Sequence, residues 1–84
     1  MFNHLLLFRS LTRTQMASAA LEKSGIPNRI VRAPKSVSEE GCSHSVRLHQ
    51  GTLHRALTLL KPLGLEPKRV FVSADDENYE EVLF

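Results

Sequence analysis

The residue best suited to chemistry is Cys42, the only cysteine among the 84 residues. It lies in a stretch without apolar periodicity, from Ala33 to Ser43. The thiolate is the nucleophilic form of cysteine, and basic residues or a helix start nearby lower the pKa of a thiol. His44 follows two residues later, and a neighbouring imidazole can accept a thiol proton or help to bind a metal. A structural or solvent-facing histidine is the alternative interpretation of His44.

Cys42 also fits a structural role. It shares strand parity with Val46 and Leu48, and free cysteine is often buried as a small apolar residue. One cysteine leaves no partner for an internal disulfide, and no zinc-ligand spacing accompanies it, so we expect no metal. Metal binding by Cys42 and His44 across a dimer is the remaining alternative, and we expect no cofactor. A lone thiol favours a reducing, cytoplasmic location. The apolar run Leu5–Phe8 is too short for a signal sequence or a membrane span.

The apolar pattern predicts four strands and two helices. Short apolar or alternating runs predict strands over 3–9, 28–33, 44–48 and 69–72. Apolar residues three or four apart predict one helix that ends at Gly25 and another that runs from Thr52 to about Lys61. Thr12 fits a capping box at the start of the first helix, and Ser10 is the competing cap. The expected apolar faces are Met16, Ala17, Ala20 and Leu21 in the first helix, and Leu53, Ala56, Leu57, Leu60 and Leu63 in the second.

This order of elements, β-α-β-β-α-β, is typical of the ferredoxin-like α+β sandwich. Its right-handed crossovers place two helices on one face of a four-stranded antiparallel sheet. We expect a single domain over 1–73 and an acidic C-terminal tail over 74–84. Leu5–Phe8, with Phe71 or its neighbours, predict an exposed apolar patch on the uncovered face, which suggests a homodimer or a partner surface there. The alternative is that the C-terminal Val82-Leu83-Phe84 folds back over this face.

The expected topology brings two distant segments together. In this fold the end of the first strand, the start of the first helix and the loop between the second and third strands share one end of the sheet. Ser10, Thr12 and Arg13 are therefore predicted to lie near Cys42. A helix start offers unpaired N–H groups and partial positive charge, which favour a thiolate and would equally bind a small anion.

Charge is distributed unevenly along the chain. All eleven lysines and arginines precede residue 75, whereas five of the nine acidic residues lie in 75–84. A basic body favours an acidic partner, and ordinary solubility is the alternative reason for it. No nucleic-acid-binding signature is present, so nucleic acid is not an expected partner.

Several short motifs occur in an order that is more specific than any one of them. They are Phe8-Arg9-Ser10-x-Thr12, Gly25-Ile26, Pro34-Lys35 and a serine-rich turn that leads into Gly41-Cys42-Ser43. By these motifs the chain resembles the selenium/sulfur carrier-like family, a group of small bacterial domains, over roughly residues 3–73. Lys35 stands where this family usually has arginine, and Ser43 stands where it usually has glycine.

The resemblance implies a carrier more than an enzyme. Cys42 would hold a sulfur or selenium atom as a persulfide or perselenide, and the partners would be the donor and acceptor proteins of the transfer. Gly41 and Ser43 would shape the loop, and Lys35 would supply charge near the thiol. The alternative function is an interaction or small-anion-binding module with a structural cysteine and a dimerising sheet face.

Overall fold

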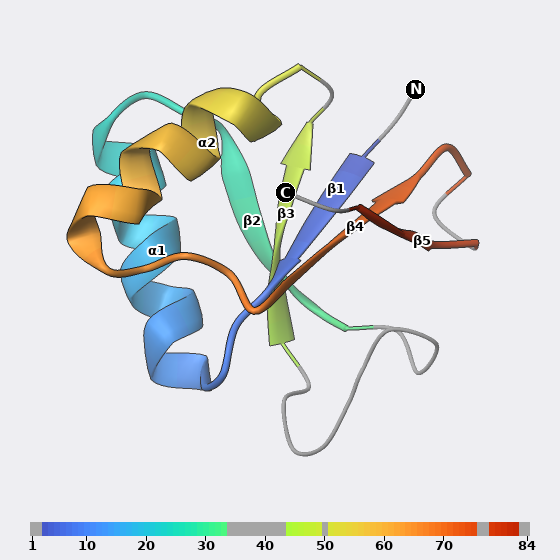
Figure 1. The fold of residues 1–84 in the computed structure, drawn as a ribbon, viewed down its shortest axis with the longest axis horizontal. Coiled ribbons are helices and arrows are strands. Elements are labelled where there is room, and N and C mark those ends of the chain that lie inside the picture. Colours follow the sequence, from blue (N-terminus) through green and yellow to red (C-terminus); the bar gives the residue numbers. More distant parts are fainter. Residues whose placement is uncertain (1–2, 34–43, 50, 76–77, 83–84) are drawn as a thin grey trace.

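The computed structural model describes residues 3–33, 44–49, 51–75 and 78–82. Within these ranges the chain forms five strands, two α-helices and one short 3-10 helix, arranged as a helical layer on a sheet (Figure 1). The elements are β1 (Asn3–Leu7), α1 (Leu11–Lys23), β2 (Asn28–Arg32), β3 (His44–His49), α2 (Leu53–Leu60), η1 (Lys61–Leu63), β4 (Arg69–Ser73) and β5 (Glu80–Val82).

The described strands form one sheet in the order β2-β3-β1-β4-β5, and every neighbouring pair is antiparallel. The predicted α+β class is therefore confirmed, but the predicted number of four strands is wrong. The additional strand, β5, lies in the segment that was expected to be an acidic tail, and it pairs with β4. Two contacts favour this pairing: Arg69 Nε lies 3.5 Å from Glu81 Oε2, and Val82 packs against the main core.

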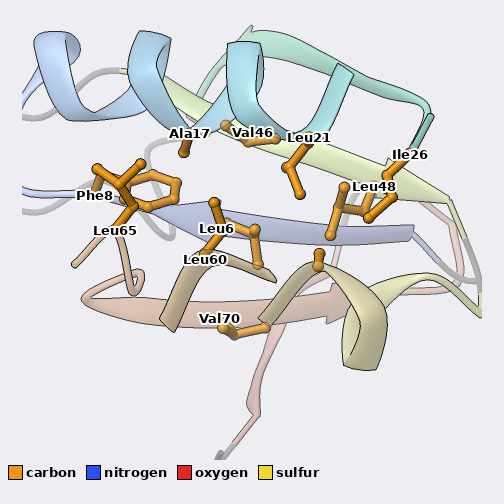
Figure 2. Packing of buried hydrophobic residues seen from close by; sticks show 11 residues of the cluster. Leu6, Phe8, Ala17, Leu21, Ile26, Val46, Leu48, Leu60, Leu65 and Val70 are labelled. Atoms are coloured by element: carbon orange, nitrogen blue, oxygen red, sulfur yellow. The ribbon is translucent and has the colours of Figure 1, made fainter. Parts of the chain in front are cut away.

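The main core lies between the sheet and the helices (Figure 2). Leu6 of β1 stands opposite Val46 of β3 and Val70 of β4, and directly opposite residues of neighbouring strands share one face. These three side chains are fully buried, as are Leu21 of α1 and Leu60 of α2. Both helices therefore cover the same face of the sheet.

The other face carries a smaller apolar cluster. Leu5, Leu7 and Phe71 are only 2%, 2% and 6% exposed, and Val31 and Tyr79 pack against them. The predicted exposed patch is thus wrong for Leu5, Leu7 and Phe71, because these side chains are already covered within the single chain.

The helix ends match the glycine and proline signals in the sequence. Gly25 follows α1 with φ +76°, and Gly64 follows η1 with φ +71°. Both values lie in the left-handed region, which glycine adopts without a Cβ clash. Pro62 coincides with the change from α2 to the tighter turn of η1, since proline cannot continue an α-helix. Within the described ranges, neither α-helix has the length and apolar character needed to cross a bilayer.

Two residues assigned to the apolar helix faces point elsewhere. Met16 is 53% exposed and Leu63 is 54% exposed, whereas Ala17 and Leu60 are fully buried. Met16 directly precedes Ala17, so it lies about 100° away from it around the helix. Leu63 follows Pro62, where the 3-10 geometry changes the angular position of each residue. The expected core roles of Met16 and Leu63 are therefore wrong.

Candidate functional site

The first turn of α1 is held by Ser10. Its extended backbone (φ −151°, ψ 162°) places the side chain as the N-cap, and its Oγ accepts a hydrogen bond from the Arg13 N–H at 3.2 Å. The Ser10 carbonyl accepts from the buried Thr14 side chain, Oγ1, at 2.9 Å. Ser10 is therefore the cap, as its competing assignment predicted, and the capping box at Thr12 is wrong. Thr12 lies exposed in the first turn.

The Arg13 side chain joins the two parts of the helical layer. Its Nη1 donates a hydrogen bond to the carbonyl of Gly64 at 3.0 Å, just beyond η1. A pocket of about 350 Å³ lies at this junction. Its lining residues are Ser10, Thr12, Arg13, Met16, Leu63, Gly64 and Leu65.

The sequence-based prediction named only three of the seven residues that line this pocket. It selected Ser10, Thr12 and Arg13 but assigned no functional role to Met16 or Leu63. The connection requires knowledge of where η1 lies relative to α1, and no local pattern supplies it. The available signal was the pair Pro62 and Gly64, which predicts a turn but does not predict that this turn packs beside the start of α1.

His44 lies at the same end of the sheet as the start of α1. It opens β3 opposite Arg32, the last residue of β2, and the next residue, Ser45, stands opposite Leu7 at the end of β1. The described residues therefore confirm that the end of β1, the end of β2 and the start of β3 share one end. His44 is half-buried within the sheet, whereas the Arg13 guanidinium is directed towards Gly64.

Four of the predicted site residues lie outside the described residues: Lys35, Gly41, Cys42 and Ser43. Their assigned roles remain predictions. Among the described residues, no group of three or more histidine, aspartate or glutamate side chains is placed to hold a metal ion.

A second group of basic residues was not identified from the sequence. Arg29 of β2 stands directly opposite Arg47 of β3, and like charges in this arrangement repel each other. Both line a pocket of about 340 Å³ with His49, and Glu22 belongs to the same lining. The strand register creates this group, which is why the spacing of basic residues along the chain did not reveal it.

The ionisation of His4 is perturbed by its position in the sheet. It lies on β1 opposite Leu48 and Val72, and burial lowers the pKa of its imidazole because the charged form loses hydration. His4 therefore favours the neutral form in the folded protein. It is half-buried in the sheet and lines none of the pockets described above.

Comparison with known families agrees with the order of motifs. The chain matches the family model described as "Putative Se/S carrier protein-like" over residues 3–72. Because this range covers most of the 84 residues, the chain belongs to that family. Comparisons with curated proteins and with solved structures give no significant match.

Proposed function

We propose that this protein is a sulfur or selenium carrier that holds the atom on Cys42. The observation that carries the proposal is the family match over residues 3–72, which includes Cys42. The carrier would work in the cytoplasm, where a single thiol stays reduced between rounds of transfer. Transfer passes an existing persulfide sulfur from one protein to another, so it needs no bound cofactor.

The loading step balances without an added oxidant. The Cys42 thiolate attacks the outer sulfur of a donor persulfide and forms a new S–S bond, while the donor S–S bond breaks and the donor cysteine leaves as a thiolate. The rate of such exchange depends on the thiolate fraction of the attacking group. In this proposal Lys35 favours the thiolate by its charge, and Gly41 and Ser43 give the donor access to the sulfur.

The described geometry supports the proposal at the start of α1. Ser10 and Arg13 hold a well-formed helix start at the end of the sheet where His44 begins β3. The element order β1-α1-β2-β3-α2-β4 and the strand order β2-β3-β1-β4 also support a ferredoxin-like arrangement, in which these segments belong together.

The test is an intact-mass measurement after incubation with a cysteine desulfurase and cysteine. We expect wild type to gain one sulfur that a reducing thiol removes, and we expect Cys42→Ala to gain none. No added sulfur on wild type, or equal labelling of the variant, would contradict the proposal. The alternative of a structural cysteine in an interaction or anion-binding module predicts slow alkylation of Cys42 at neutral pH and a concentration-dependent oligomer.

A further inference from the structure

The pocket beside Arg13 is lined by large apolar side chains that are exposed to solvent. Among the described residues, three large apolar side chains are strongly exposed, and two of them, Met16 and Leu63, line this one pocket. They come from α1 and η1, which are far apart in the sequence. The third, Leu11, lies at the start of α1 and does not line the pocket.

The internal packing of the domain does not require these two side chains. The neighbouring Ala17 and Leu60 are fully buried and supply the core contacts of their helices. When a partner covers apolar side chains that are exposed to water, the free energy of the system falls. Met16 and Leu63 are therefore available to a ligand that brings apolar surface.

The walls of the pocket are held in place before any partner binds. The Arg13 guanidinium spans from α1 to the Gly64 carbonyl at 3.0 Å, and Gly64 N–H in turn donates to the Lys61 carbonyl at 3.1 Å. The first bond ties η1 to α1, and the second closes the last turn of η1 itself. A preformed pocket loses less conformational entropy on binding than one that must assemble.

The chain segments that contain the pocket lining are rich in basic residues. The lining residues fall within residues 9–16 and 61–68, and these two segments together contain four exposed basic residues and one exposed acidic residue, Glu66. None of the lining residues is acidic. Lys68 is held beside the end of β1 by a 2.7 Å hydrogen bond from its N–H to the Leu7 carbonyl. The basic residues are Arg9, Arg13, Lys61 and Lys68.

We propose that the Met16–Leu63 pocket is the docking surface for the donor protein, and that the donor presents a large apolar side chain flanked by acidic residues. This inference rests on the proposed carrier function. Apolar contact would supply affinity, and the opposite charges would speed the encounter and orient the donor. The pocket includes the start of α1, which lies at the same end of the sheet as His44. A docked donor therefore approaches the end of the sheet where β2 ends and β3 begins.

The experiment measures the rate of sulfur transfer from a cysteine desulfurase, supplied with cysteine, against carrier concentration. The test variant is Met16→Ser with Leu63→Ser, and the matched control is Leu11→Ser, which removes an exposed apolar side chain outside the pocket. We expect the double variant to raise KM about tenfold or more, with kcat nearly unchanged, and Leu11→Ser to leave KM unchanged.

Two further measurements separate docking from chemistry. Loading by glutathione persulfide needs no docked protein, so it should proceed at the wild-type rate in the double variant and in Leu11→Ser. Arg13→Gln should raise KM more than Lys23→Gln, which removes the same charge from the other end of α1, and added salt should reduce this difference. Thermal unfolding followed by circular dichroism confirms that each variant is folded.

The outcomes distinguish the two proposals. A wild-type protein that gains no sulfur from the desulfurase overturns the carrier function and the docking surface together. A wild type that is loaded normally, with the same KM in the double variant, overturns the docking surface alone. An equal loss of glutathione persulfide loading in the double variant also overturns it, because the effect would then lie in the thiol and not in docking.

Discussion

Two buried serines lie on the same face of the sheet, and we expect their replacement by alanine to change the stability of the fold in opposite directions. Ser45 of β3 is fully buried, and Ser73 of β4 is 2% exposed. No described residue gives the Ser45 hydroxyl a hydrogen-bond partner. The Ser73 hydroxyl donates to Asp75 Oδ1 at 3.1 Å and accepts from the Asp75 N–H at 3.3 Å. Replacement by alanine therefore removes a desolvated, unsatisfied hydroxyl at one site and a satisfied one at the other.

The magnitudes follow from the energetics of buried hydroxyls. A buried donor or acceptor without a partner lowers the stability of the fold by about 1–3 kcal/mol, whereas a typical internal hydrogen bond raises it by a net of about 0.5–1.5 kcal/mol. We expect Ser45→Ala to raise the free energy of unfolding by about 1 kcal/mol. In a domain of this size, that change raises Tm by about 4–8 °C. Ser73→Ala should lower the free energy of unfolding by about 1 kcal/mol, and it also leaves Asp75 without this contact.

The assay is urea unfolding at constant pH, followed by circular dichroism for wild type and both variants. Equal slopes of free energy against urea would show that the two substitutions act on stability and not on the unfolded chain. A loss of stability in Ser45→Ala comparable to that of Ser73→Ala would refute the reasoning, because it would mean that both hydroxyls contribute favourable interactions.

Two further predictions concern the start of α1 and the central strand. Ser10→Ala should lower the free energy of unfolding by about 1 kcal/mol through loss of the N-cap, whereas Ser10→Gly should lower it by only about a few tenths of a kcal/mol. Equal urea midpoints for the two variants would contradict the capping role. Burial lowers the pKa of His4, so the unfolded chain binds a proton there more readily than the folded protein does. The free energy of unfolding is therefore highest above the unfolded pKa of about 6.5, where His4 is neutral, and it decreases as the pH falls below that value. His4→Gln should therefore flatten the decline in urea midpoint between about pH 7 and about pH 5, and an NMR titration of wild type that places the His4 pKa at or above the unfolded value would overturn this prediction.

Much of the fold could be predicted from local patterns. The runs around Leu6, Val46 and Val70 are apolar or alternating, and they form the strands expected of them. Gly25 and Pro62 marked the ends of the helices because their backbone restrictions act locally. These features depend on near neighbours in the sequence, so a single sequence carries them.

The errors arose where distant contacts decide the structure. The segment containing β5 is acidic and polar, and it becomes a strand only because β4 offers an edge, with Arg69 beside Glu81. Thr12 and Ser10 are both good caps, and the backbone that leaves β1 selects Ser10. Met16 belongs to the pocket because η1 lies next to α1.

For the candidate site, the sequence predicted where two segments lie relative to each other but not where a side chain lies. The topology placed the start of α1 and the start of β3 at one end of the sheet, and Ser45 opposite Leu7 confirms this for the described residues. The side chain of Arg13 could not be placed from the sequence, because its acceptor is a backbone carbonyl at Gly64. Any residue type offers such a carbonyl, so its sequence position carries no signal.

The position of β1 has a consequence for how the domain folds. β1 is the first strand in the sequence but lies in the middle of the sheet, where Leu7 pairs with Ser45 on one side and with Arg69 on the other. Both edges of β1 are therefore satisfied only after most of the chain is available. Pairing between such distant segments slows folding, and until β4 arrives the apolar run Leu5–Leu7 presents an open edge. Folding during synthesis should thus be completed late, with β1 the segment most exposed to misassembly.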